Sequence, residues 1–355
     1  MVLLGSTGSI GVNTLKIAKK FNIDVEILVA GNNIELLNKQ IKEHNPKLVI
    51  IANSLDIKKV NHPNVLCGEE AILSAIDQSK SELVVNALVG FLGLKPTLKA
   101  IESNKKVALA NKESLVAGGA FIDTTKIIPI DSEHFGLWYL LQNRPIKKMI
   151  ITASGGAFRD WDLKDIKTAT LADTQKHPNW NMGQKITIDS ATMVNKLFEL
   201  LEARWLFGEG SYDAIIETNS LIHALIDFND GSTTAHLAHA NMQLPIAYAL
   251  DRDMKMPILD NINLLEVGSL EFRAIEKERY PIWQIKDDLL KNPHKGVVVN
   301  AANEVAIAKF IDKKIGFSDI AKTILSAYEK FDAKAKSIDE VFEIDEQVRG
   351  FCHEI

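Results

Sequence analysis

An apolar run leads directly into three regularly spaced glycines in Val2-Leu3-Leu4-Gly5-Ser6-Thr7-Gly8-Ser9-Ile10-Gly11. The apolar run suits a short buried strand, and residues 12–21 repeat apolar side chains at helical spacing. Glycine permits the tight turn that a strand needs when it runs straight into a helix. We therefore read this stretch as the first strand, turn and helix of an α/β fold.

The alternation of strands and helices continues through the next hundred residues. Further strand candidates lie at 25–30, 48–52, 83–88, 107–110 and 127–130. They are continuous runs of Val, Ile and Leu, which is typical of strands buried on both faces. Helical patterns such as 34–44 separate them. This order predicts a Rossmann-like, doubly wound parallel sheet in a first domain of residues 1–128.

The remaining chain predicts two more domains. Residues 129–255 form an α/β catalytic (connective) domain with strands expected at 149–152, 214–216, 224–227 and 233–239 and a helix expected at 191–207. The polar stretch 154–184 within it is long enough for a lid loop over a binding site. Residues 256–280 are a linker, and 281–355 form a small all-α domain with helices expected at 301–311, 317–330 and 338–351.

Composition excludes several classes of function. The 355 residues carry a net charge of -5 and no basic face that would bind nucleic acid. No apolar run approaches the roughly 20 residues that a membrane helix needs. The only cysteines, Cys67 and Cys352, are far apart and indicate no disulfide framework. We therefore expect a cytoplasmic protein with neither a nucleic-acid nor a membrane partner.

The glycine turn indicates a dinucleotide site, because a pyrophosphate is stabilised at a helix N-terminus that the backbone can approach closely. The spacing G-x-x-G-x-x-G is a variant of the usual motif, and a plain strand-to-helix turn is the alternative. The second strand ends in Gly31-Asn32-Asn33, with no carboxylate to repel a 2′-phosphate and no arginine to bind one. The residues alone therefore leave NAD and NADP open.

Three carboxylates are candidates for a metal site. Asp131 and Glu133 follow the strand at 127–130, where alternate residues of an extended chain point the same way. Glu199 lies on an otherwise apolar helix and shares a face with Asn195 and Lys196. Three carboxylates without a Cys or His cluster favour Mg²⁺ or Mn²⁺. The alternatives are a solvated loop for the first pair and an exposed ion-paired stripe for Glu199.

A second polar set indicates an anion site. Ser190 is expected just ahead of the helix at 191–207, where its hydroxyl is either an N-cap or joins Asn195 and Lys196 around a phosphate. Ser154-Gly155-Gly156 and Lys112 complete the set, Lys112 lying after the strand at 107–110. By default a lysine in that place is a surface charge.

Together these segments resemble one family, the 1-deoxy-D-xylulose 5-phosphate reductoisomerases. The matching stretches are residues 5–11, Ala110–Ser114, Asp131–His134, Ser154–Gly156, the run from His177 to Glu199, and Asn300–Glu304. They occur in the family's order along nearly the whole chain. The run from 177 to 199 is the most specific of them.

The resemblance implies a role for each site residue. NADPH would contact Thr7, Gly8, Ser9, Ile10, Gly31, Asn32, Asn33, Asn111, Glu113 and Gly183. One Mg²⁺ or Mn²⁺ would be bound by Asp131, Glu133 and Glu199. The substrate phosphate would be held by Ser154, Ser190, Asn195 and Lys196, and the hydroxyketone end by Lys112, Ser132, Glu133 and His177. Trp180 and Met182 would lie on the lid.

The resemblance also implies the reaction. In it, 1-deoxy-D-xylulose 5-phosphate is rearranged and then reduced by NADPH to 2-C-methyl-D-erythritol 4-phosphate, which is the committed step of the non-mevalonate isoprenoid route. The resemblance further implies a homodimer. Two rival functions remain, a metal-free nicotinamide dehydrogenase and a non-catalytic sensor that binds NADP.

The chain departs from the family pattern at three places. Ile216-Glu217-Thr218-Asn219-Ser220 stands where Ile-His-Pro-Gln-Ser is common, and Ala238–Gln243 stands where Gly-x-Pro-Asp-Met-Arg is usual. These two changes put the local sheet packing and the subunit contact in question. Asn32 replaces the lysine or arginine of many relatives, which implies weaker binding of the 2′-phosphate.

Overall fold

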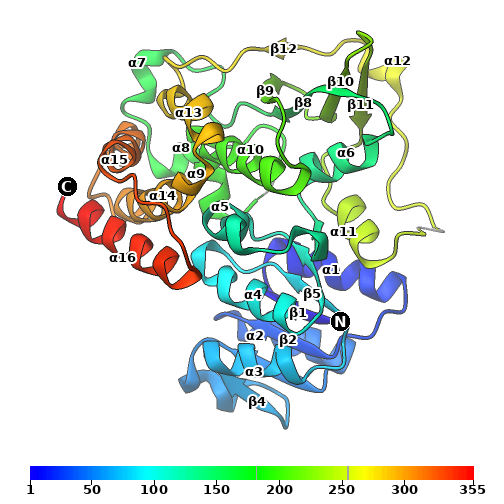
Figure 1. The fold of residues 1–355 in the computed structure, drawn as a ribbon. Helices are drawn as coiled ribbons and strands as arrows, with labels where there is room; N and C mark the ends of the chain where they lie inside the picture. The colour runs from blue at the N-terminus through cyan, green and yellow to red at the C-terminus, as the bar shows by residue number, and fades with distance from the viewer. Residues whose placement is uncertain (181, 254–255) are drawn as a thin grey trace. The chain divides into compact units, whose positions relative to one another are not determined.

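The computed structural model describes residues 1–180, 182–253 and 256–355 (Figure 1). Asn181 of the expected lid, and Met254 and Lys255 at the end of the expected second domain, lie outside the described residues. The chain divides into two compact units. The first comprises residues 1–114, 122–132 and 241–260, and the second comprises 115–121, 133–240 and 261–355.

The first unit contains a seven-stranded sheet in the order β4-β3-β2-β1-β5-β6-β7, in which every neighbouring pair runs parallel. Its strands are β1 (Val2–Leu4), β2 (Ile27–Ala30), β3 (Leu48–Ile51), β4 (Val65–Cys67), β5 (Leu83–Asn86), β6 (Lys106–Leu109) and β7 (Ile127–Pro129). The predicted doubly wound sheet is therefore confirmed. The sequence did not reveal β4, because this edge strand has only three residues, none of them buried.

Helices follow most strands of this sheet and cover it. They are α1 (Ser9–Lys20), η1 (Ser54–Lys59), α2 (Ile34–His44), α3 (Glu69–Gln78), η2 (Gly90–Gly93), α4 (Leu94–Glu102), η4 (Thr124–Lys126) and α11 (Gln243–Leu250). Although α11 is distant in sequence, its Ile246 and Ala247 belong to the same buried cluster as Leu3 and Leu28. Every residue of β1 is buried, so the turn that follows it starts from the centre of the sheet.

The second unit is built on a mixed five-stranded sheet in the order β11-β10-β8-β9-β12. Its strands are β8 (Ile146–Ala153), β9 (Tyr212–Glu217), β10 (Ile222–Phe228), β11 (Thr233–Leu237) and β12 (Phe272–Arg273). Only β8 and β9 pair in parallel. The four longer strands agree with those expected, whereas β12 has two residues and gives no pattern in the sequence.

A left-handed residue divides the helix that the sequence placed at 191–207. The structure has α9 (Gln184–Thr192) and α10 (Val194–Phe207), which meet at Met193 with φ 69°. Ser190 therefore lies in the last turn of α9, and its expected place ahead of a helix, as an N-cap, is wrong. Residues 184–190 include two Ile and a Thr, whose weak helix propensity conceals the first helix.

Two further expectations about local conformation are corrected. The stretch 154–184 contains the short helices α7 (Leu163–Ile166) and α8 (Leu171–Thr174), the latter begun by a capping box on Thr170. Helix α6 (Ser132–Leu140) begins directly after Asp131, so Glu133 is helical and the argument from an extended chain does not hold there. Helix α5 (Lys112–Gly118) and η3 (Gly119–Phe121) follow β6.

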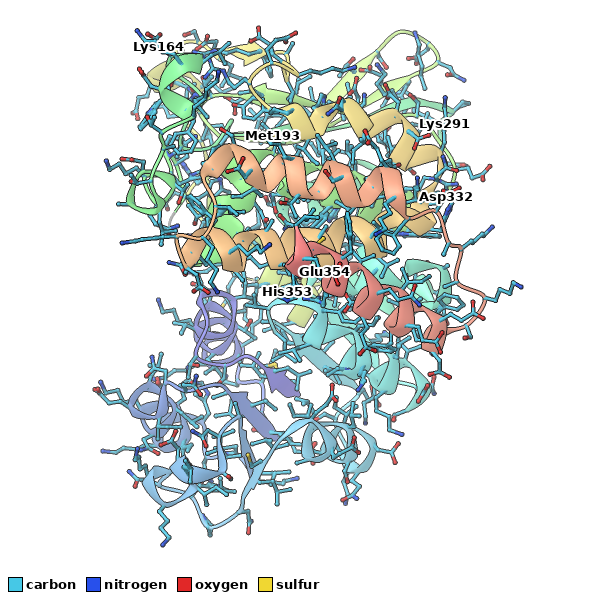
Figure 2. The ribbon with its side chains drawn as sticks, turned by 90° about the vertical axis from the view of Figure 1, so that its left-hand side faces the viewer. Lys164, Met193, Lys291, Asp332, His353 and Glu354 are labelled. Carbon is cyan, nitrogen blue, oxygen red and sulfur yellow. The ribbon has the colours of Figure 1, made fainter. Side chains whose placement is uncertain are left out.

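The C-terminal part of the second unit is helical, as predicted. Its elements are α12 (Leu264–Val267), η5 (Pro281–Ile285), α13 (Lys286–Lys291), η6 (Pro293–Lys295), α14 (Gly296–Ile311), α15 (Phe317–Lys330) and α16 (Ile338–Glu354). Figure 2 shows α15 and α16 beside α14, with Asp332 just beyond α15 and Glu354 at the end of α16. In the described part of the chain, every helix is too short or too polar to cross a bilayer.

Candidate functional site

The glycine turn after β1 is shaped by close backbone approach. Gly5 has φ +83°, and a Cβ added to it would lie 2.4 Å from the carbonyl oxygen of Ala87. A Cβ on Gly11 would lie 2.3 Å from Gly5 O. Gly8 is exposed and is the N-cap of α1 without a side-chain cap hydrogen bond. The N-terminus of α1 is therefore open to an anion beside Thr7, Ser9 and Ile10.

The ribose side of the turn carries no charge of its own. Gly31 and Asn32 are exposed after β2, and nothing lies within 4 Å of a Cβ added to Gly31. Asn33 caps α2 by accepting a hydrogen bond from Leu36 N at 3.1 Å. Asn32 is therefore the side chain at this strand end that is available to a ribose substituent.

The ends of β6 and β7 are tied together by an ion pair. Lys112 Nζ lies 2.8 Å from Asp131 Oδ2, and the lysine is buried. Beside it, Asn111 Nδ2 donates to Leu88 O and Gly90 O at 3.0 and 2.8 Å, which fixes the loop after β5. Glu113 is buried with its Oε2 3.0 Å from Asn111 Nδ2. Lys112 is thus not a surface charge.

A second ionic cluster lies in the second unit and joins α6 to α10. Lys196 Nζ lies 2.7 Å from Glu133 Oε1 and 2.5 Å from Glu199 Oε2, and Lys196 and Glu199 are both buried. Asn195 Nδ2 donates to Glu199 Oε1 at 2.5 Å. The expected shared face of α10 is present, and it is buried, so the exposed ion-paired stripe is wrong.

The electrostatics of this cluster favour a cation. Burial by itself lowers the pKa of Lys196, but the carboxylates of Glu133 and Glu199 outweigh it and raise that pKa above its usual value. The carboxylates of Glu133 and Glu199 both approach the ammonium of Lys196 in a largely buried place. Carboxylate oxygens are the ligands that Mg²⁺ and Mn²⁺ prefer, so these residues fit a divalent ion.

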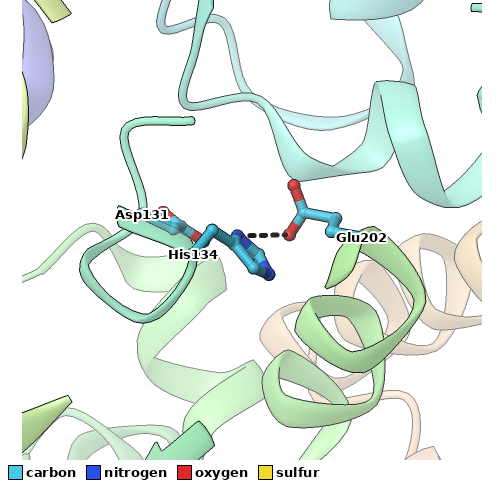
Figure 3. A group of neighbouring side chains, drawn as sticks. All are labelled: Asp131, His134 and Glu202. Atoms are coloured by element: carbon cyan, nitrogen blue, oxygen red, sulfur yellow. Dashed lines mark ion pairs between the residues drawn. The ribbon is translucent and has the colours of Figure 1, made fainter. Parts of the chain in front are cut away.

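His134 fixes the two elements that carry the carboxylates. Its Nε2 lies 2.8 Å from the carbonyl oxygen of Glu199, which can only accept, so the ring donates from Nε2. Its Nδ1 lies 3.9 Å from Glu202 Oε2, as Figure 3 shows. In the sequence, His134 is noticeable only as the last residue of the stretch Asp131–His134. Its role in holding α6 against α10 was not predicted.

Ser154 and His177 form a hydrogen-bonded pair whose proton positions follow from geometry. His177 Nδ1 accepts from the backbone N–H groups of Asn179 and Trp180 at 3.2 and 2.9 Å. The neutral ring therefore carries its proton on Nε2 and donates to Ser154 Oγ at 2.8 Å. Ser154 Oγ also accepts from Gly156 N at 3.2 Å. Its own O–H is left to donate to a ligand.

Gly156, two residues after Ser154, lies against the last turn of α9. Gly155 and Gly156 have φ of +88° and +70°, and a Cβ on Gly156 would lie 2.6 Å from Ser190 O. Ser190 is half-buried, and no hydrogen bond joins its hydroxyl to another residue in the described ranges. The structure thus places Gly156, which also donates to Ser154 Oγ, against the last turn of α9, which carries Ser190.

The lid segment is anchored on the turn between β9 and β10. Asn179 Nδ2 donates to Thr218 O at 2.9 Å and to Ser220 Oγ at 2.7 Å. The ring of Trp180 lies 6.2 Å from that of His223. Met182 is half-buried, and Gly183 is the exposed N-cap of α9. Asn179 belongs to the run from His177 to Glu199 that resembles the family, but its anchoring role was not predicted.

Comparison with known proteins decides the family. Models of the 1-deoxy-D-xylulose 5-phosphate reductoisomerase, of its C-terminal domain, and of a further DXP reductoisomerase C-terminal domain match residues 1–119, 127–207 and 237–351. The chain belongs to the 1-deoxy-D-xylulose 5-phosphate reductoisomerase family. It is therefore an enzyme of the oxidoreductase class.

Relatives cover the whole chain. The reductoisomerase of Nautilia profundicola is 61% identical over 361 residues, 99% of each chain, and that of Wolinella succinogenes is 51% identical over 358 residues, 100% of each. A solved DOX-P reductoisomerase in complex with NADPH, fosmidomycin and magnesium is 30% identical with a TM-score of 0.92, covering 99% of this chain and 97% of its own. The Zymomonas mobilis reductoisomerase with NADPH is 32% identical with a TM-score of 0.88 over the same shares.

Glu217, at one of the places where a departure from the family pattern is expected from the sequence, shapes the turn between β9 and β10. Glu217 is fully buried and accepts hydrogen bonds from Asn219 N, Leu221 N and Ile222 N at 2.7, 2.7 and 3.1 Å. It thereby shapes the turn whose Thr218 O receives Asn179 of the lid and also Arg159 Nη1, at 2.9 Å. The carboxylate of Glu217 thus holds the backbone of this turn through three hydrogen bonds.

The buried state of His177 predicts a pH dependence. Burial, together with the charges of Arg159 and Lys196, lowers the pKa of His177 to about 4. Because the folded pKa lies below the ordinary value of 6.5, the folded state favours the neutral ring. The free energy of unfolding should therefore fall as the pH drops from about 6.5 toward about 4.

Urea unfolding at several pH values tests this, with His177→Gln as the comparison. The variant should lose part of the pH dependence within that window. Identical pH profiles of the two proteins, or an NMR titration of His177 with a midpoint near its ordinary pKa, would contradict the burial argument.

Proposed function

We propose that this member of the family uses NADPH and one divalent cation, Mg²⁺ or Mn²⁺, to convert 1-deoxy-D-xylulose 5-phosphate into 2-C-methyl-D-erythritol 4-phosphate in non-mevalonate isoprenoid biosynthesis. The observation that carries the proposal is the buried cluster of Lys196, Glu133 and Glu199 in a chain of this family. Further support comes from solved family structures described as complexes with NADPH and magnesium.

We propose the same residue roles that the resemblance implies. Asp131, Glu133 and Glu199 hold the cation, Ser154, Ser190, Asn195 and Lys196 hold the phosphate, and Lys112, Ser132, Glu133 and His177 contact the hydroxyketone end. The cofactor contacts Thr7, Gly8, Ser9, Ile10, Gly31, Asn32, Asn33, Asn111, Glu113 and Gly183. Trp180 and Met182 lie over the substrate. Ser154 Oγ accepts from His177 and from Gly156 N, so among the described residues its O–H can still donate; this supports its part, since a phosphate oxygen accepts such a bond.

The chemistry follows from these roles. Cleavage and re-addition of the carbon skeleton give an aldehyde, and a hydride from NADPH with one proton gives the alcohol and NADP⁺. A bound divalent cation supplies Lewis-acid stabilisation of negative charge on oxygen. The chain's own residues orient the substrate: Lys196 and Ser154 hold the phosphate away from the reacting carbons, so its binding energy serves positioning. Neutral His177 donates from Nε2 to Ser154 Oγ. Closure of the lid excludes water from the site.

We also propose a division into residues 1–128, 129–255, 256–280 and 281–355, and a homodimer in the cytoplasm. The two sheets and the helices after residue 281 support the division. Leu264, Leu265 and Phe272 are large apolar side chains exposed around β12, an edge strand, which supports self-association. Light scattering coupled to gel filtration measures the mass directly.

Chelation separates the proposal from its rivals. With 1-deoxy-D-xylulose 5-phosphate present, EDTA should abolish NADPH oxidation and added Mn²⁺ should restore it. A metal-free dehydrogenase would keep full turnover in EDTA. A sensor would bind NADPH and never oxidise it with this sugar phosphate.

Cofactor preference should respond to Asn32. We expect Asn32→Arg to lower the KM for NADPH by about tenfold and to leave the KM for NADH unchanged, because only NADPH offers a 2′-phosphate to the new guanidinium. Steady-state kinetics with both cofactors checks this. An equal change in the KM for NADPH and in the KM for NADH would show that Asn32 does not lie at the ribose site.

A further inference from the structure

A buried hydrogen bond links the C-terminal helices to the helix that carries Ser190. Asn303 Nδ2 on α14 donates to Asp189 Oδ1 on α9 at 2.7 Å, and both residues are buried. Both helices belong to the second unit. The residues are 114 positions apart, so the bond is a tertiary restraint rather than a local one.

The other oxygen of Asp189 is also held. Lys185 Nζ, one turn earlier on α9, lies 2.8 Å from Asp189 Oδ2. Thr192 Oγ1 donates to the carbonyl oxygen of Asp189 at 3.2 Å. A buried carboxylate bonded on both oxygens by an amide and an ammonium has one defined position. Asp189 therefore fixes the last turn of α9, in which Ser190 is the next residue.

This restraint acts where the helix does not continue. Met193 is left-handed, so α9 and α10 share no unbroken helical ladder that would fix Ser190 relative to Asn195 and Lys196. Gly156 packs on Ser190 from one side, with room for no Cβ. On α14, Asn303 is buried beside Ala302 and Val305 in the sequence, and Asn300 is a second buried polar residue one turn earlier. A buried polar group that loses its partner costs free energy, so the bond between Asn303 and Asp189 favours one arrangement of α9 and α14.

We propose that Asn303 is a positioning residue for the substrate phosphate. Through Asp189 it sets the last turn of α9, and hence places the Ser190 hydroxyl at a fixed distance from the Asn195 and Lys196 side chains. This inference rests on the proposed function, in which Ser190, Asn195 and Lys196 hold that phosphate.

A double-mutant cycle with Ser190 tests the proposal. Asn303→Leu keeps the number and branching of the side-chain heavy atoms and removes the bond to Asp189. We expect a rise of about tenfold in the KM for 1-deoxy-D-xylulose 5-phosphate with kcat unchanged. Inorganic phosphate, used as a competing ligand, should show a parallel rise in its inhibition constant. Ser190→Ala should raise KM as well, and the double variant should resemble Ser190→Ala, because both changes act through one hydroxyl.

Glu304→Gln is the matched control. Glu304 is the next residue on α14 and lies 2.7 Å from Arg349 of α16, so this change weakens an ion pair between α14 and α16. It should leave both constants unchanged. If Asn303→Leu does not fold, Asn303→Ser goes through the same cycle.

Two results would overturn the proposal. One is a lowered melting temperature of the Asn303 variant with unchanged KM and phosphate inhibition. The other is a double variant in which the two increases multiply. Failure of the unaltered enzyme to turn over the sugar phosphate is a different result, which would overturn the proposed function.

Discussion

Replacing Glu199 with Gln should lower kcat by at least about a hundredfold, because the Lewis-acid contribution of a bound cation is several kcal/mol and each 1.4 kcal/mol is about tenfold in rate. Gln has the shape of Glu and keeps a hydrogen-bonding end group. Lys196 also retains its ion pair with Glu133, at 2.7 Å. The fold should therefore persist, and the affinity for Mn²⁺ should fall together with turnover.

Glu202→Gln is the matched control for this change. Glu202 lies less than one turn further along α10, is equally buried and faces His134 at 3.9 Å. It should keep its turnover and its Mn²⁺ affinity. Titration calorimetry with Mn²⁺ and steady-state kinetics measure both variants. Near-normal turnover and Mn²⁺ affinity of Glu199→Gln would show that Glu199 does not hold the metal.

Replacing Lys196 with Met should cost about 3–5 kcal/mol of stability in metal-free enzyme, because the change leaves the carboxylates of Glu133 and Glu199 without their ammonium. A cation that binds the folded state restores stability by mass action. Saturating Mg²⁺ or Mn²⁺ should therefore raise the melting temperature of Lys196→Met more than that of the unaltered protein. Substrate binding should weaken by about 1.5–3 kcal/mol even with metal present.

Lys286→Met controls for the loss of a largely buried lysine. Lys286 Nζ lies 2.9 Å from Asp213 Oδ1 in the same unit, away from the proposed metal ligands. Its loss of stability should not be reversed by either metal. Thermal melts with and without metal compare the two variants. Equal rises in melting temperature on adding metal, or an unchanged KM for the sugar phosphate in Lys196→Met, would show that Lys196 has a purely structural role.

The sequence predicts those parts of the fold that a periodic pattern encodes. Buried strands such as β1 and β8 appear as apolar runs, and α15 appears in its full length from its helical spacing. The break at Met193 was missed, because a left-handed methionine gives no local signal and tertiary packing selects it. For the same reason, the sequence misplaced Ser190 relative to its helix.

At the site, the residue types were predictable but their pairing was not. The sequence placed Glu199, Asn195 and Lys196 on one face of a helix, which the periodicity of 3.6 requires. It could not reveal that Glu133 lies 2.7 Å from Lys196, since the two are 63 residues apart. Nor could it show that Asn303 bonds to Asp189, because such contacts depend on how α14 packs against α9.

The most direct test of the proposed reaction is to identify its product. Purified enzyme is incubated with Mn²⁺, NADPH and 1-deoxy-D-xylulose 5-phosphate, and the sugar phosphate is analysed by NMR while NADPH absorbance is followed. We expect 2-C-methyl-D-erythritol 4-phosphate to form in equal amount to the NADPH consumed, and only with metal present. NADPH consumption that yields an unrearranged straight-chain alcohol, or no consumption with metal present, would contradict the assignment.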